Sequence, residues 1–219
     1  MERIILACDS LQLHVDAAQE RMGTHYEVRL LDSRLHAQPE KMNEAVFAAI
    51  GEMPEQVDTV LLAMGLCGGS VSGRPFPRRT VIPKVDDCIT LLLHRDQTWH
   101  LNLKECGHFY LTDTLDGRLS IENMHRRLIE EYGEEDGGDI FDMWFANYKS
   151  VDIIDTGAYP CRSAAYVEKA KRQASLVHCP LTYVGGSNLL LEKLVSGRWD
   201  EQFIVAEKGQ VLEQAAFSA

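Results

Sequence analysis

The chain lacks long apolar runs and has few basic side chains. No apolar run among its 219 residues approaches the roughly 20 consecutive positions that a membrane-spanning helix requires, so we expect no membrane partner. Its 22 lysines and arginines are outnumbered by 33 aspartates and glutamates, for a formal net charge of −11. Because nucleic-acid binding requires a basic surface, this balance argues against nucleic acid as a partner. The first residues also lack the pattern of a secretion signal, and we expect a cytoplasmic protein.

Short motifs of several well-known sites are also missing. No two cysteines have the Cys-x-x-Cys spacing of thioredoxin-like proteins and zinc ribbons. The Gly-Gly-Ser-Asn segment at 185–188 lacks the lysine of a P-loop and the spacing of a dinucleotide-binding fingerprint. We interpret it as a tight strand-to-helix turn, with an anion cradle as the alternative. Any metal site must therefore be assembled from residues far apart in the sequence.

The chain does contain a regular alternation of apolar runs and helical segments. Short unbroken apolar runs predict strands, and stretches that begin with a capping residue or a proline predict helices. This order predicts an α/β fold with a parallel sheet covered by helices on both faces. We expect a single domain over 1–219, and the renewed alternation in the last third allows two Rossmann-like lobes over about 1–115 and 116–219. The expected strands cover 3–7, 26–31, 59–64, 80–82, 108–112, 151–154, 181–184 and 203–206, and the expected helices 11–22, 39–53, 88–94, 120–132, 139–149, 163–175 and 189–195, with a polar break at 133–138.

Six cysteines are more than packing requires in such a chain, and structural disulfides are disfavoured in the cytosol. Cys8, Cys67 and Cys88 each follow a different predicted strand, and His36 follows another. Ligands of parallel sheets bind outside the carboxyl ends of the strands, so these side chains are expected at one edge. Three thiolates and an imidazole suit tetrahedral zinc, whereas three cysteines with an open fourth position suit an iron–sulfur cluster. The alternative is that the cysteines are small buried hydrophobic residues.

Other residues near these cysteines are candidates for supporting roles. Gly68 and Gly69 would let the backbone approach a bulky cofactor closely. His36 is expected to act as a fourth ligand or as an acid–base group. Asp87 caps the helix that follows it or serves as a catalytic carboxylate. Three arginines in the loop between Cys67 and Cys88 would orient a carboxylate or phosphate of a substrate, or simply line a solvated loop: Arg74, Arg78 and Arg79.

The second half of the chain offers further thiols and imidazoles. Cys106 is followed by His108 at a spacing that is too common to identify a site, and His178 precedes Cys179 directly. Cys161 stands at the start of a predicted helix, where the helix dipole would stabilise a thiolate. The sequence leaves open whether any of these residues joins the site.

The blocks Gly65-Leu66-Cys67-Gly68 and Asp87-Cys88-Ile89, with several shorter ones, resemble the DUF1638 family. That family is found in methanogens and anaerobic bacteria, often near genes for corrinoid-dependent methyltransferases. The position of Asp86 is often histidine in that family, and that of Met64 is often tyrosine. The resemblance covers nearly the whole chain, and its Gly-Leu-Cys-Gly and Asp-Cys-Ile blocks are the most specific. The matching blocks are Leu35-His36, Pro39-Glu40-Lys41, Gly65-Leu66-Cys67-Gly68, Val81-Ile82-Pro83-Lys84, Asp87-Cys88-Ile89, Tyr110-Leu111-Thr112, Leu190-Leu191 through Gly197, and Trp199-Asp200.

This resemblance implies a link to anaerobic one-carbon or methyl-group metabolism without supplying a reaction. One hypothesis is a metal-dependent enzyme, a transferase for example, that binds a thiol or another small polar substrate at the cysteine-rich site. The alternative is a non-catalytic ligand-binding protein or an accessory partner of a corrinoid methyltransferase. The chain lacks the Asp-x-His-x-x-Gly motif of corrinoid-binding proteins, and this absence argues against direct binding of a corrinoid.

Overall fold

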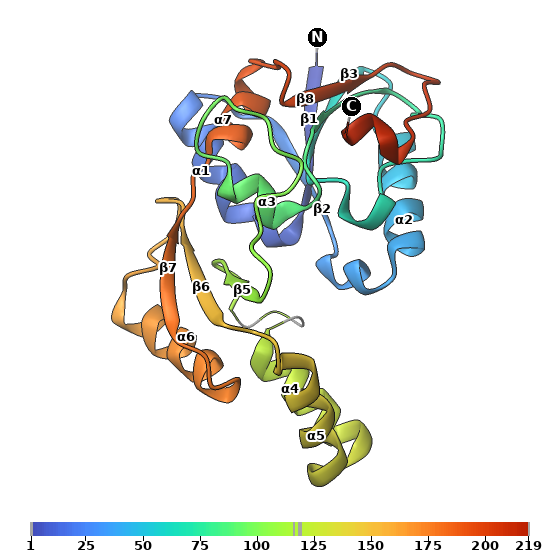
Figure 1. Ribbon diagram of the computed structural model, residues 1–219. Coiled ribbons are helices and arrows are strands. Elements are labelled where there is room, and N and C mark those ends of the chain that lie inside the picture. The colour runs from blue at the N-terminus through green and yellow to red at the C-terminus, as the bar shows by residue number, and fades with distance from the viewer. Residues whose placement is uncertain (1, 116, 118–119, 219) are drawn as a thin grey trace. The chain divides into compact units, whose positions relative to one another are not determined.

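The computed structural model describes residues 2–115, 117 and 120–218, and it has the predicted α/β fold (Figure 1). The chain forms two compact units. The first unit comprises Met1–Leu103 and Ser187–Ala219, and the second comprises Lys104–Gly186. The first unit is thus discontinuous in sequence, whereas the two lobes expected over 1–115 and 116–219 were each continuous. None of the helices in the described part of the chain combines the length and the apolar character that a membrane crossing requires.

A five-stranded sheet with the order β2-β1-β3-β4-β8 forms the centre of the first unit. Neighbouring strands are parallel except for β4 and β8, which pair antiparallel. The parallel arrangement predicted from the apolar runs is therefore confirmed for four strands, and β8 is the exception. The strands are β1 (Glu2–Cys8), β2 (Glu27–Leu31), β3 (Val57–Ala63), β4 (Arg79–Pro83) and β8 (Phe203–Ala206).

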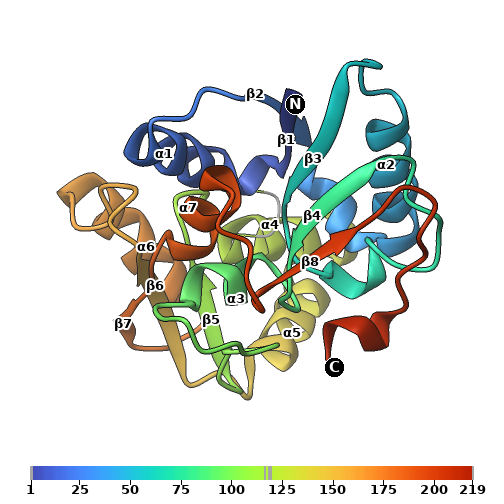
Figure 2. The ribbon, with the colours of Figure 1, turned by 90° about the horizontal axis from the view of Figure 1, so that it is seen from above.

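Helices cover both faces of this sheet, as Figure 2 shows. The helices α1 (Gln12–Met22), α3 (Cys88–Leu93) and α7 (Leu189–Ser196) lie on one face, and α2 (Pro39–Gly51) lies on the other. Side chains alternate between the faces along a strand, so Ile4, Leu6 and Cys8 of β1 share one face. Ile4 and Leu6 belong to the same buried cluster as Met42 and Val46 of α2. Cys8 therefore faces the α2 side of the sheet.

The chain order creates a topological switch point in the first unit. From β1 the chain runs through α1 to β2 at the edge of the sheet, and from β2 it crosses through α2 to β3 on the other side of β1. The carboxyl ends of β1 and β3 thus lie side by side, with their connections leaving in opposite directions. Open α/β sheets bind ligands at this position.

The second unit contains a three-stranded parallel sheet of β5 (His108–Leu111), β6 (Ser150–Asp155) and β7 (Leu181–Gly185), in that order. Its helices are α4 (Ile121–Tyr132), α5 (Glu134–Phe145) and α6 (Ala164–Leu176). Its own core includes Leu111, Ile121, Phe141, Val151, Ile153 and Ala170.

The polar break predicted at 133–138 is wrong, because α5 begins at Glu134. A β-carbon on Gly137 would lie 2.5 Å from the carbonyl oxygen of Leu128 in α4. Gly137 therefore allows two helices to pack closely, and it does not interrupt α5. Only Gly133, with a φ of +87°, breaks the helical path between α4 and α5.

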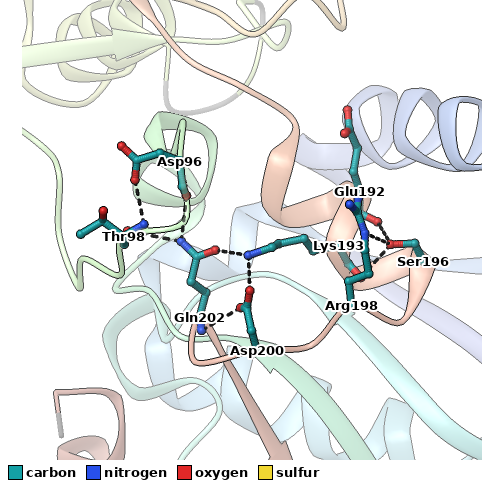
Figure 3. A network of polar contacts seen from close by, with 8 residues as sticks. All are labelled: Asp96, Thr98, Glu192, Lys193, Ser196, Arg198, Asp200 and Gln202. Atoms are coloured by element: carbon teal, nitrogen blue, oxygen red, sulfur yellow. Dashed lines mark hydrogen bonds and ion pairs between the residues drawn. The ribbon is translucent and has the colours of Figure 1, made fainter.

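A buried lysine links α7 to the segment before β8 (Figure 3). Lys193 is 3% exposed, and its ammonium group binds the Asp200 carboxylate and the side-chain oxygen of Gln202. The amide of Gln202 donates in turn to the carbonyl oxygens of Asp96, at 3.1 Å, and Thr98, at 3.3 Å. The loop that follows α3 is thereby fixed to the C-terminal part of the first unit.

Candidate metal centre

Cys8 ends β1 and is completely buried. Its sulfur lies 3.3 Å from Nε2 of His36 and 3.0 Å from Oγ of Ser10. His36 belongs to a short 3₁₀ helix, Ser33–Ala37, that follows β2. The backbone N–H of Ser33 donates to the carboxylate of Asp9 at 3.1 Å, which ties the end of β2 to the end of β1. This tie brings the imidazole to the thiol from 28 residues away.

The loops that follow β3 and β4 are joined by backbone hydrogen bonds, as the two strands are. The N–H of Leu66 donates to the carbonyl oxygen of Val85 at 2.9 Å, and the N–H of Cys67 donates to that of Asp86 at 2.7 Å. Gly65 makes this approach possible, because a β-carbon there would lie 2.8 Å from the backbone of Asp87. As a result the sulfur of Cys67 lies 3.9 Å from the sulfur of Cys88.

Cys88 connects Cys67 to Cys8 and His36. It is the first residue of α3, whose N-cap Asp87 accepts a hydrogen bond from the N–H of Thr90 at 2.8 Å. The ligand atoms of Cys8, His36 and Cys88 all lie within 4.8 Å of one another. The four residues predicted from the ends of different strands thus meet at the carboxyl edge of the sheet. We call Cys8, His36 and Cys88 the central trio, with Cys67 beside it.

The ionisation of the trio reflects its crowding. The pKa of the Cys8 thiol is raised by its hydrogen bond with Cys88 and by burial, while the neighbouring imidazole opposes the shift. The pKa of Cys88 is raised well above its ordinary value by its contact with Cys67 and by burial. The hydrogen bond with Cys8 raises the pKa of His36, and the nearby carboxylates of Asp9 and Asp87 add to the effect. These thiols can therefore all become thiolates only if a cation compensates their charge. A metal ion that binds them would supply that positive charge, because coordination to a metal deprotonates a thiol.

The glycines predicted to cradle a cofactor lie against protein atoms. Gly68 and Gly69 have φ values of +69° and +96°, so the turn requires residues without a side chain. A β-carbon on Gly68 would lie 3.4 Å from the ring of Pro39, and one on Gly69 would lie 2.6 Å from the side-chain nitrogen of Gln214. Both glycines serve the packing of the loop around Cys67.

The three arginines predicted to orient a substrate do not meet at the trio. Arg79 is the first residue of β4 and therefore lies at the amino edge of the sheet, where it pairs with Glu207 at 3.1 Å. Arg78 precedes it and donates to the carbonyl oxygens of Val57 and Met53. Arg74 is half exposed and lies 3.7 Å from the carboxylate of Glu44.

The remaining cysteines lie in the second unit. Cys106 is exposed, Cys161 is buried, and the sulfur of Cys179 lies 3.4 Å from the carbonyl oxygen of Tyr148. His178 has a φ of +53° in the turn after α6. Within the described residues, the one group of three or more potential metal ligands is the central trio.

Two residues that help to form the site, Ser10 and Gly65, were not predicted from the sequence. Ser10 reaches the Cys8 sulfur, and its position two residues after the cysteine gave a weak signal for this contact. Gly65 sets the approach of the two loops, which the sequence could not show because its neighbour Asp87 is 22 residues away.

Comparison with known proteins identifies the family of this chain. A search of curated proteins and a search of solved structures each found no match. A family model described as "Protein of unknown function (DUF1638)" matches residues 30–195, a span that contains His36, Cys67 and Cys88. The match covers more than half of the sequence, and the chain therefore belongs to the DUF1638 family.

Proposed function

We propose that this protein binds a single zinc ion at the central trio and uses it in one-carbon or methyl-group metabolism. The observation that carries the proposal is the convergence of two sulfurs and one imidazole nitrogen, from three different strand ends, within 4.8 Å. Cysteine and histidine together are the ordinary ligands of zinc in proteins. Cys67 stands close enough to Cys88 to supply a third sulfur.

The interatomic distances favour one metal ion over an iron–sulfur cluster. Zinc bonds of about 2.3 Å to sulfur and about 2.0 Å to nitrogen in a tetrahedron place two sulfurs about 3.8 Å apart, and a sulfur and a nitrogen about 3.5 Å apart. The corresponding distances here are 3.9 Å for Cys67 and Cys88, and 3.3 Å for Cys8 and His36. In a cubane cluster each cysteine binds a different iron atom, so the sulfurs are spread further apart.

Such a centre would bind and activate a thiol or another small polar substrate. A free thiol has a pKa of about 8.5 and is a poor nucleophile until it is deprotonated, which coordination to zinc accomplishes. The resemblance to a family encoded near corrinoid-dependent methyltransferases connects this chemistry to methyl-group transfer. His36 would act as a ligand, and Asp87, which caps α3 and lies near the imidazole, would help to fix its orientation.

A non-catalytic role is the second candidate, and the number of donors favours it. Three cysteines and one histidine can fill all four positions of a tetrahedral zinc ion, which is typical of structural sites. The protein would then be a binding or accessory partner of corrinoid methyltransferase components. The two candidates differ in whether the fourth position of the metal exchanges with solution.

Metal analysis of the protein purified without oxygen tests the proposal. The wild-type protein should contain one zinc ion per chain, and Cys8→Ser and Cys88→Ser should lose most of it. Cys106→Ser is the matched control, because Cys106 is exposed and lies in the second unit. A brown protein with iron and sulfide would favour the cluster instead. Zinc contents that are equal in the wild type and the Cys8 and Cys88 variants would reject the metal centre.

A further inference from the structure

Cys67 lies next to the central trio and is not one of its members. Its sulfur contacts Cys88 at 3.9 Å, but it is not part of the group whose ligand atoms all lie within 4.8 Å of one another. The trio alone supplies three protein ligands, which is the number that zinc sites with an exchangeable position retain. The fourth position is therefore the one that Cys67 would occupy.

The backbone of Cys67 is held in an unusual conformation. Its φ of +45° lies in the left-handed region, which residues with a side chain rarely adopt. Glycine would fit there without strain, and the next two residues are glycines with positive φ. Strain of this kind clusters at sites of function, where the surrounding structure maintains it. The thiol of Cys67, which faces the trio, is thus the reason we assign for a residue with a side chain at this strained position.

The loop around Cys67 is fixed through its backbone. The N–H of Cys67 donates to Asp86, and its carbonyl oxygen accepts a hydrogen bond from the hydroxyl of Ser70 at 2.7 Å. The side chain of Asn43 in α2 donates to the carbonyl oxygens of Ser70 and Ser72. Rotation about the side-chain bond of Cys67 can therefore move its sulfur toward or away from the trio while the loop stays in place.

From these observations we infer that Cys67 is the exchangeable ligand of the metal and that the incoming ligand is a substrate thiol. This inference rests on the metal centre proposed above. The bond between the metal and the Cys67 sulfur breaks, and a bond between the metal and the substrate sulfur forms. The proton of the substrate thiol moves to the Cys67 sulfur, so the charge at the metal does not change. Soft thiolate replaces soft thiolate, which favours thiols over carboxylates or water as the incoming ligand.

Cobalt(II) replacing zinc provides a test, because its sulfur-to-metal absorption reports the number of bound thiolates. The key variant is Cys67→Gly, since glycine suits a φ of +45° and should leave the loop folded. It should retain one cobalt per chain with about two thirds of the wild-type absorption, because two thiolates of three remain. Ethanethiol should restore the missing absorption, at a lower concentration than is required to displace Cys67 in the wild type. Cys8→Ser, which disrupts the trio, should lose the metal.

The outcomes separate this inference from the metal centre itself. If Cys67→Gly loses cobalt as Cys8→Ser does, while circular dichroism shows that it is folded, Cys67 is a permanent ligand and the exchange is rejected. The exchange is equally rejected if Cys67→Gly keeps the full absorption, or if ethanethiol restores none of it. A wild-type protein that binds no cobalt and no zinc would reject the metal centre, and the exchange with it.

Discussion

At the scale of single residues, the site depends on two loops that approach each other through Gly65. A β-carbon at this position would lie 2.8 Å from the backbone of Asp87, the residue before Cys88. Backbone atoms cannot move aside as the end of a flexible side chain can. The distance between the sulfurs of Cys67 and Cys88 is therefore set by a residue that carries no functional group.

Gly65→Ala should consequently weaken metal binding without removing a ligand. The added methyl group forces the two loops apart, and we expect the affinity for zinc to fall by about tenfold or more, as for other residues that support metal ligands. Competition with a chelator of known affinity measures the change. Gly138→Ala in α5 is the control, because a β-carbon there meets no atom within 4 Å. Equal zinc affinities for Gly65→Ala and Gly138→Ala would contradict this account of the loops.

The buried His14 of α1 should make the stability of the protein depend on pH. His14 has no exposed surface, and burial lowers its pKa from 6.5 to about 4. Between these pH values the unfolded chain binds a proton at His14 that the folded protein does not. The contribution of His14 to the free energy of unfolding is therefore fully present above pH 6.5. It is lost as the pH falls toward 4, by about 3 kcal/mol in total.

Replacement of this histidine should remove that pH dependence. His14→Gln should show a flatter decline of the unfolding free energy between pH 6.5 and pH 4 than the wild type, measured by urea denaturation at several pH values. His25→Gln, at an exposed position, is the control and should retain the wild-type decline. An unchanged slope in His14→Gln would show that the buried imidazole does not govern the acid sensitivity.

The convergence of the candidate ligands was predictable, because each follows a strand in a parallel sheet. Cys8, Cys67 and Cys88 needed no knowledge of the packing beyond the strand order. The placement expected for Arg78 and Arg79, beside the cysteines, shows the limit of this reasoning. Proximity in sequence to Cys67 and Cys88 placed them beside the site, whereas β4 carries Arg79 to the opposite edge of the sheet.

At the scale of elements, the polar contacts of Lys193 hold α7 and the segment before β8 to the loop after α3. That loop also supports the segment that carries Asp86 and Cys88 of the candidate metal centre. The carbonyl oxygen of Leu101 accepts a hydrogen bond from the N–H of Asp86 at 2.8 Å, and Trp99 donates to the carbonyl oxygen of Lys84 at 2.7 Å. The network therefore connects the C-terminal part of the first unit to the loop that carries Cys88.

Lys193→Met should destabilise the first unit, because it leaves the side-chain oxygen of Gln202 without its buried donor. The expected cost is about 2 kcal/mol, within the range for a buried polar group that loses its partner. Urea denaturation measures it, with the exposed Lys208→Met as the matched control. A stability within error of that control would show that the network contributes nothing.

Most elements were predicted within two or three residues, since apolar runs and capping residues mark them directly. Ser120 and Ser163 cap α4 and α6 as their sequence context indicates. The start of α5 was not predictable, because two consecutive glycines usually interrupt a helix. The reason for Gly137 lies in its contact with the backbone of α4, which local sequence does not reveal.

At the scale of the whole molecule, the proposed ligands all belong to the first unit. Metal binding should therefore stabilise that unit selectively. Free zinc at a hundredfold excess over its Kd stabilises a binding-competent fold by about 2.7 kcal/mol. In hydrogen exchange, we expect zinc to slow the exchange of β1 and β3 and to leave that of β6 unchanged. Protection of β6 to the same extent as β1 would contradict this expectation.

The return of the C-terminal segment to the first unit was beyond the reach of sequence patterns. Alternating strands and helices continue from one unit into the next, and no glycine- or proline-rich linker marks a boundary. The return of Ser187–Ala219 to the first unit depends on the pairing of β8 with β4. Pairing partners so distant along the chain leave no signal in local composition.

The most direct test of the metal centre is X-ray absorption spectroscopy at the zinc edge of the metal-loaded wild-type protein. We expect four ligands around zinc, with sulfur at about 2.3 Å and one imidazole nitrogen at about 2.0 Å. Sulfur should contribute at least the two ligands from Cys8 and Cys88. A coordination shell that contains only oxygen and nitrogen would show that the cysteines do not bind the metal.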